Sequence, residues 1–218
     1  MDAKELAKLE IFKKAKISLR YWLVGRGYLT AVKAMEYASN IHKGKRKDGF
    51  TPEFYHQLSM AHYARVFEPL LIHKEETYGT IFLHDTPEDY DVSCNELTSL
   101  FGDIMADAAM SLSKNVDGRK VSNTEYFRFM YKNPIVSVCK GVDRINNFQT
   151  MVNVFAADNQ LAYIIETENH ILPMIKKAKR LFPEQESIYE NIKVMLLNQL
   201  EFVKIIHKER DVKSEDKH

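Results

Sequence analysis

Apolar residues recur at helical spacing along nearly the whole of this 218-residue chain. No segment combines a two-residue alternation of apolar and polar residues with the β-branched enrichment that is typical of strands. The pattern therefore predicts an all-α fold, a helical bundle of about ten helices. We expect these helices over residues 2–17, 30–43, 56–68, 75–85, 93–101, 103–114, 122–132, 134–148, 158–180 and 185–208.

Several predicted helix ends carry a residue that favours an end there. Thr30 is a candidate N-cap of the second helix, and Gly44 follows its last turn. Ser122 and Glu125 have the spacing of a capping box at the start of another helix. Pro134 has the fixed φ that suits the first turn of the helix 134–148.

Length and composition bound the class of protein. With 45% hydrophobic residues the chain can bury one sizeable core, so we expect a single domain. The formal charge of +1 gives no overall field that would attract nucleic acid or a membrane surface. The two cysteines, Cys94 and Cys139, form no disulfide framework, and no stretch reaches about 18 apolar residues. We therefore expect a cytoplasmic protein whose partners include neither nucleic acid nor a membrane.

The run from His84 to Asp89, H-D-T-P-E-D, sets one imidazole and three carboxylates directly after an apolar stretch. His84 and Asp85 are adjacent and could share one cation, and imidazole with carboxylate suits Mn, Fe, Zn or Co better than Ca. For Glu88 and Asp89 another interpretation is open. Thr86 would be an N-cap, and the two acids would answer the positive end of a helix dipole.

His56 is a second candidate ligand. On a helical wheel it shares a face with Met60, Tyr63 and Phe67, so it points inward. A lone histidine on an apolar face is more often a hydrogen-bonded core residue than a ligand. A catalytic metal usually needs three or more protein groups, however, and His56 would supply one.

The predicted helix 134–148 has one apolar face and an opposite polar face that carries Lys140, Asp143, Arg144 and Asn147. An ordinary amphipathic helix with a solvated side explains this pattern. The alternative is that the polar face lines a cleft. Asp143 would then supply a carboxylate ligand, and the other three side chains would bind anions or ribose.

A basic cluster of Lys43, Lys45, Arg46 and Lys47 lies in the longest predicted loop. A solvated charge run is the usual explanation for so short a cluster. The alternative is a phosphate site in which the Arg46 guanidinium stacks on a purine and the lysines meet phosphates.

Taken in order, these motifs resemble the hydrolase (HD) domain of the RelA/SpoT alarmone enzymes, in its small single-domain form. That family's pattern is A-x-x-x-H-x-G-x-x-R-K-x-G, a later His, L-H-D-x-x-E-D, F-G and K-x-x-D-R-x-x-N-x-x-T. The match covers about residues 31–180, and the order of its motifs makes it specific. The counterparts here are Ala38 to His42, Gly44, Arg46, Lys47, Gly49, His56, Leu83, His84, Asp85, Glu88, Asp89, Phe101, Gly102, Lys140, Asp143, Arg144, Asn147 and Thr150.

The resemblance implies one divalent metal ion, usually Mn. It implies that the ligands of this ion are His56, His84, Asp85 and Asp143. It also implies that Glu88 and Asp89 are the acidic pair that positions or deprotonates the attacking water.

On the substrate side the resemblance implies that Arg46 and Lys47 contact the guanine and a flanking phosphate, and that Asn147 and Thr150 contact the sugar or 5′ side. Lys140 and Arg144 would bind substrate anions from the same helix face. The implied activity is removal of the 3′-pyrophosphate of ppGpp or pppGpp. Two alternatives stay open: a phosphohydrolase for ppApp, a deoxynucleotide or the 2′-phosphate of NADPH, and a non-catalytic nucleotide-binding or antitoxin-like module.

The resemblance also divides the chain. We expect an N-terminal helical extension over 1–29, the hydrolase domain over 30–182, a C-terminal helix over 183–208 that packs on the domain, and a frayed tail over 209–218. The extension is a candidate lid or dimer contact, so a homo-oligomer is a candidate assembly.

The chain departs from the family pattern at several places inside its motifs. Thr86 and Pro87 stand where the family has an aliphatic pair, and the spacing from His42 to Arg46 is one residue shorter than usual. Two further departures are single residues near the site. Gln57 follows His56 where the family commonly has proline, and Asp48 adds a negative charge to the basic loop. We expect the Asp48 carboxylate to oppose a substrate as anionic as ppGpp.

Overall fold

The chain folds as helices with one short β-ribbon, in a computed structural model that describes residues 3–116, 118–152 and 154–215. The all-α prediction is confirmed. The α-helices are α1 (Ala3–Arg26), α2 (Leu29–Ile41), α3 (Tyr55–Ala64), α4 (Lys74–Leu83), α5 (Thr86–Asp89), α6 (Cys94–Phe101), α7 (Asp103–Met110), α8 (Asn123–Phe127), α9 (Pro134–Met151), α10 (Ala157–Glu166), α11 (Leu172–Leu181) and α12 (Glu186–Glu215). Shorter helical turns are η1 (Arg65–Leu70), η2 (Met130–Lys132), η3 (Thr167–Ile171) and η4 (Pro183–Gln185), and the antiparallel ribbon pairs β1 (Asn115–Val116) with β2 (Arg119–Lys120).

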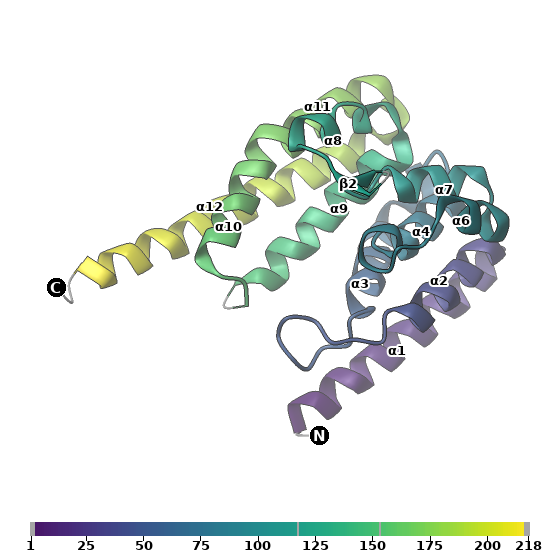
Figure 1. The fold of residues 1–218 in the computed structure, drawn as a ribbon, viewed down its shortest axis with the longest axis horizontal. Helices are drawn as coiled ribbons and strands as arrows, with labels where there is room; N and C mark the ends of the chain where they lie inside the picture. The colour runs from purple at the N-terminus through teal and green to yellow at the C-terminus, as the bar shows by residue number, and fades with distance from the viewer. Residues whose placement is uncertain (1–2, 117, 153, 216–218) are drawn as a thin grey trace.

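Helix α4 is the centre of the bundle. It packs against α2, α3, α7 and α9, and every side chain from Thr77 to Leu83 is buried. The first turn of α4 is charged, but the rest of the helix is buried on all sides and so lies inside the protein. The chain that leaves α4 (Figure 1) therefore starts from the interior, so His84 is buried, whereas the side chain of the next residue, Asp85, is partly exposed.

Helices α9 and α12 form the second half of the bundle (Figure 1). Gly141 lets them approach closely, because a Cβ at this position would lie 2.8 Å from Ile192 Cγ2. Helix α12 buries Ile188, Tyr189 and Ile192 and then runs on to Glu215, past the predicted end at 208. Of the segment 209–218, for which we expected a frayed tail, residues 216–218 lie outside the described residues.

The start of α2 differs from the expected cap. The helix begins at Leu29, so Thr30 is inside it and is not the N-cap. The free backbone N–H groups of Thr30 and Ala31 instead donate to Glu75 Oε1, at 2.6 and 3.2 Å. A side chain from α4 therefore replaces the local cap, which no sequence-local rule can predict.

Two predicted helices have other limits in the structure. Helix α1 continues to Arg26 because Leu19 and Leu23 lie on its buried side. The predicted helix 158–180 is divided into α10, the π-helical turn η3 and α11. Pro173 explains this division, since it has no N–H and its ring crowds the preceding turn of an α-helix.

Two of the predicted helix starts are confirmed. The Ser122 hydroxyl accepts the Glu125 N–H at the start of α8, and Pro134 opens α9 behind an Asn133 cap. No helix in the described ranges is both long and apolar enough to cross a bilayer.

Candidate metal centre

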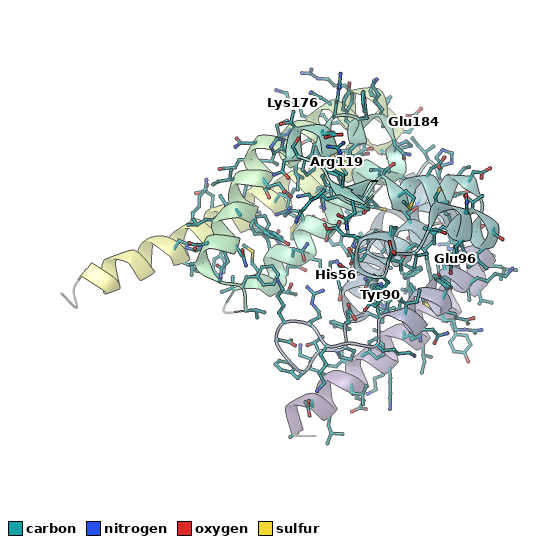
Figure 2. All side chains as sticks on the ribbon, viewed as in Figure 1. His56, Tyr90, Glu96, Arg119, Lys176 and Glu184 are labelled. Carbon is teal, nitrogen blue, oxygen red and sulfur yellow. The ribbon has the colours of Figure 1, made fainter. Side chains whose placement is uncertain are left out.

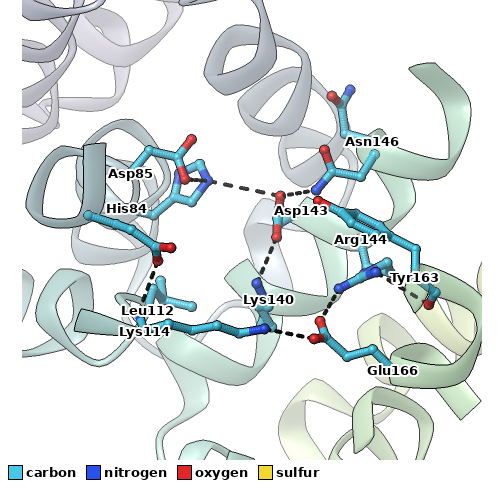
Figure 3. Close-up of polar contacts among 12 residues, drawn as sticks. His84, Asp85, Leu112, Lys114, Lys140, Asp143, Arg144, Asn146, Tyr163 and Glu166 are labelled. Atoms are coloured by element: carbon cyan, nitrogen blue, oxygen red, sulfur yellow. Dashed lines mark hydrogen bonds and ion pairs between the residues drawn. The ribbon is translucent and has the colours of Figure 1, made fainter. Parts of the chain in front are cut away.

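Four candidate ligands meet where α3, the α4–α5 junction and α9 come together. The His56 and His84 rings and the Asp143 carboxylate are buried, and their ligand atoms lie within 4.8 Å of one another. His56 Nε2 is 3.2 Å from Asp143 Oδ1, and His84 Nε2 is 2.9 Å from Asp85 Oδ1. The four groups predicted as metal ligands are thus one cluster, of which Figure 3 shows His84, Asp85 and Asp143.

The two rings are oriented by acceptors on their other nitrogen. His84 Nδ1 is 2.8 Å from the Ile81 carbonyl oxygen, and His56 Nδ1 is 2.7 Å from Asn146 Oδ1. Nδ1–H therefore donates in both rings, and Nε2 is directed at the carboxylates. Such partners fix the tautomer and orientation of metal-binding histidines.

The charges of the cluster are strongly coupled. Burial lowers the pKa of His84, but the carboxylates of Asp85 and Asp143 outweigh it and raise the pKa to about 9. Burial raises the pKa of Asp85, whereas His84 and His56 lower it, and the result is about 2. The pKa of Asp143 is also held well below its usual range, since burial is outweighed by Lys140, His56 and His84.

This donor set fits a divalent transition metal. It offers two imidazole nitrogens and two ionised carboxylates, the combination that suits Mn, Fe, Zn or Co. His84 Nε2 is buried and has hydrogen-bond geometry to no described atom, although Asp85 is close. A cation at Nε2 would satisfy this nitrogen.

Behind the cluster, Asp143 is held by its own helix. Lys140 Nζ donates to Asp143 Oδ2 at 3.0 Å, and Asn147 Nδ2 donates to Oδ1 at 2.7 Å. Burial lowers the pKa of Lys140, but electrostatic interactions with Tyr126 and Asp143 raise it by more. The net shift is upward, so the amine stays charged. Lys140 and Asn147 thus serve Asp143 in this structure and do not line the cavity beside the cluster.

Arg144 is part of a buried ion-pair network (Figure 3). Its guanidinium pairs with Glu166, donates to the Tyr163 carbonyl at 3.3 Å and stacks 4.1 Å from the Tyr163 ring centroid. Lys114 Nζ reaches the same Glu166 carboxylate at 2.7 Å. Arg144 therefore connects α9 to α10 and does not face the cavity.

The two predicted catalytic acids have different surroundings. Asp89 lines the cavity, and burial with the charges of Asp85, Glu88 and Glu53 raises its pKa to about 6. Glu88 Oε2 accepts the Lys114 backbone N–H at 2.9 Å and does not line the cavity.

Thr86 is not an N-cap. It is the first residue of α5, and its hydroxyl donates to the Leu83 carbonyl oxygen at 2.7 Å. The interpretation in which Thr86 caps a helix that begins in the run His84–Asp89 is therefore wrong about its N-cap.

A cavity of about 410 Å³ opens beside His56 and Asp85. Its basic side includes Arg46 and Lys47, and its far side includes Thr150. Arg46 Nη2 donates to Thr150 Oγ1 at 3.2 Å, and Lys47 Nζ lies 4.3 Å from the centroid of the Phe155 ring. The loop predicted for phosphate binding thus spans the cavity from α2 to the end of α9.

Asp48 lines this cavity, but both oxygens of its carboxylate accept hydrogen bonds from within the basic loop. One carboxylate oxygen accepts the Phe50 and Thr51 N–H groups at 3.0 and 2.9 Å, and the other accepts the Thr51 hydroxyl at 2.5 Å. Burial raises the pKa of Asp48, but these hydrogen bonds outweigh it and lower the pKa. Asp48 is therefore an anchor of the basic loop.

Three residues of the site were not predicted. Lys8 brings α1 to the cavity, Asn146 orients His56, and Gln57 Nε2 donates to Asp85 Oδ2 at 3.1 Å. Asn146 lies three residues after Asp143 on one helix, and Gln57 is next to His56. The spacing of these two could have drawn attention, but Lys8 is one of many lysines on α1 and has no such signal.

Two histidines and two aspartates from separate elements of the helical bundle thus lie together beside a basic cavity, as the resemblance to the HD domain implied. No protein-family model matches the chain. A curated Synechocystis sp. protein, described as a probable guanosine-3′,5′-bis(diphosphate) 3′-pyrophosphohydrolase, is 26% identical over 153 residues. The match spans 66% of this chain and 20% of that protein, so the chain spans about a fifth of its relative's length.

One solved structure is similar to this chain in fold. It is that of a metazoan ortholog of SpoT that hydrolyzes ppGpp, and it matches with a TM-score of 0.57 at 16% identity. The match covers 75% of this chain and 93% of that one. By sequence and by fold, the chain is a distant homologue of SpoT-like ppGpp hydrolases, which confirms the resemblance found in the motifs.

Proposed function

We propose that this protein is a metal-dependent phosphohydrolase that releases pyrophosphate from the 3′ position of ppGpp or pppGpp. The observation that carries the proposal is the buried cluster of His56, His84 and Asp143, with Asp85 beside it, at the edge of a cavity with a basic side. A cluster that only stabilised the fold would need neither the cavity nor an ionised carboxylate pair.

The proposed cofactor is one divalent ion, Mn, held by His56, His84, Asp85 and Asp143. When bound, such an ion would lower the pKa of a water ligand toward neutrality and would polarise a phosphoryl oxygen. Asp89 supplies the proton acceptor, because a carboxylate with a pKa of about 6 is mostly ionised at pH 7 and still basic enough to take a proton. Glu88 supports it, since its charge is one of those that raise the Asp89 pKa.

The substrate lies in the cavity, between the basic loop and the end of α9. Lys47 binds a phosphate of the substrate. Arg46 gives up its hydrogen bond to Thr150 and contacts the guanine instead. Thr150, which lines the cavity, contacts the sugar side, and Asn147 contributes through its hydrogen bond to Asp143. Lys140 and Arg144 contribute from behind, because their ion pairs hold Asp143 and α9 in place.

The decisive experiment incubates purified protein and Mn with ppGpp, ppApp, deoxynucleoside monophosphates and NADPH, and identifies the products. We expect pyrophosphate from ppGpp. Inorganic phosphate from NADPH, or turnover of another member of the panel alone, would reassign the substrate. Absence of any product would indicate a binding module. Asp85→Ala is the matched control and should lose both metal and turnover.

A further inference from the structure

Gln57 is the buried neighbour of the metal centre whose role nothing above explains. It is the third residue of α3, is 1% exposed, and donates its amide Nε2–H to Asp85 Oδ2 at 3.1 Å. The orientation of the amide follows from its partner, because an ionised carboxylate accepts hydrogen bonds and cannot donate them.

Every other candidate ligand of the centre has a partner that orients it. These partners are Asn146, the Ile81 carbonyl, Lys140 and Asn147. For Asp85, the Gln57 amide fills this place among the described residues. With Oδ2 held by Gln57, Asp85 Oδ1 stays 2.9 Å from His84 Nε2, on the side of the cluster.

The Gln57 side chain is a poor choice for stability alone. Its Oε1 atom is buried and has no hydrogen-bond partner among the described residues. A buried acceptor without a partner costs folding free energy, whereas leucine would fill similar space without an orphaned polar atom. The amide is explained by its bond to Asp85 rather than by packing.

We propose that Gln57 is a positioning residue that fixes the Asp85 carboxylate for metal binding and so raises the affinity of the centre for a divalent cation. The proposal rests on the metal centre of the proposed function, but not on its substrate. Outer partners of this kind are worth about 10- to 100-fold in metal affinity.

The test measures the Kd for Mn²⁺ alone, by electron paramagnetic resonance of the free ion, together with the thermal midpoint of the metal-free protein. Gln57→Leu should weaken Mn²⁺ binding at least about tenfold and leave the midpoint unchanged or higher. A variant with an unchanged Kd would overturn the proposal, and a lower midpoint with an unchanged Kd would assign Gln57 to packing.

Gln57→Met is the second variant. Methionine has nearly the length of glutamine and no amide, so it fills the same buried space without the hydrogen bond to Asp85. It removes the amide by a different route, and the same loss of Mn²⁺ affinity is expected.

Gln185→Leu is the matched control. Gln185 is also 1% exposed and donates to the Tyr189 hydroxyl at 2.9 Å, but it follows Glu184, which Figure 2 shows away from His56. It should lower the thermal midpoint and keep the Kd for Mn²⁺.

The product panel separates this inference from the proposed function. Weaker Mn²⁺ binding by Gln57→Leu in a protein that does not cleave ppGpp would keep the positioning role and remove the substrate assignment. Wild-type protein that binds no Mn²⁺ would remove the metal centre and the positioning role together.

Discussion

At the residue level, the His84 ring would lose a proton when the proposed metal ion binds. Its pKa of about 9 means that the metal-free ring is protonated at pH 7. A cation at Nε2 must displace that proton. We therefore expect Mn²⁺ binding at pH 7 to release about one proton per chain and to tighten by about tenfold per pH unit up to pH 8.

Isothermal titration calorimetry in buffers of different ionisation enthalpy measures this release. The sign follows from the raised pKa, since a lower pH adds protons that compete with the metal. A binding heat that is the same in every buffer would contradict the assignment of His84 as a ligand.

Asp48 was expected from the sequence to oppose an anionic substrate, and the structure makes it an anchor of the basic loop. Asp48→Ala removes the acceptor of three hydrogen bonds. Losing about 1 kcal/mol of loop ordering should raise KM for ppGpp about fivefold, even though a negative charge is removed.

Asp48→Asn is the control, because its side-chain oxygen can still accept the two backbone N–H groups. We expect its KM to stay near the wild-type value or fall below it. If steady-state kinetics gave a lower KM for both variants, charge repulsion would be the main effect of Asp48 and the anchor would be unimportant.

At the scale of elements, α1 is more than an extension outside the hydrolase core. Glu5 Oε1 accepts from Lys45 Nζ at 2.5 Å and so ties α1 to the basic loop, while Lys8 lines the cavity. The Lys8 charge acts on Asp48, which lines the same cavity, and it would also attract a phosphate bound there.

We expect Lys8→Ala to raise KM for ppGpp about tenfold, the value of a charged hydrogen bond, with little change in kcat. Lys13→Ala is the matched control, because Lys13 is an exposed lysine on α1 that does not line this cavity. Equal KM values for the two variants would exclude a substrate contact by α1.

The pairing of α9 with α10 depends on a buried charge. Arg144 is buried and pairs with the partly buried Glu166, and Glu166→Ala would leave the Arg144 guanidinium without its carboxylate. Such a loss costs about 3–5 kcal/mol of unfolding free energy.

Urea denaturation of the metal-free protein measures this cost. Glu168→Ala removes an exposed pair with Lys204 and should leave the transition almost unchanged. If Glu166→Ala unfolded at the wild-type midpoint, the network would not hold α9 in place.

At the scale of the whole molecule, periodicity was sufficient for the fold class because nearly every helix buries one face. It could not place ends that depend on distant groups. Glu75 caps α2 from another helix, and Pro173 divides a run whose apolar spacing is continuous. These contacts exist only after folding, so a local rule cannot contain them.

The site also combines residues that short motifs reveal with contacts that exist only in the folded chain. His56, His84, Asp85 and Asp143 were found because each belongs to a short motif, and the motifs occur in a known order. Gln57 was noticed as a departure from that order, but its bond to Asp85 depends on how α3 faces the α4–α5 junction. The inner groups could be predicted from sequence, whereas the orienting roles of Gln57, Asn146, Lys140 and Asn147 could not.

We propose that one divalent ion bound by His56, His84, Asp85 and Asp143 is required for hydrolysis of ppGpp. The most direct measurement strips the protein with a chelator, returns Mn in steps, and records bound metal and released pyrophosphate together, for wild type and Asp143→Asn. We predict that wild-type turnover rises with bound Mn and saturates at about one ion per chain, while the variant neither binds Mn tightly nor turns over. Full turnover by the metal-stripped wild type, or by Asp143→Asn, would contradict the account.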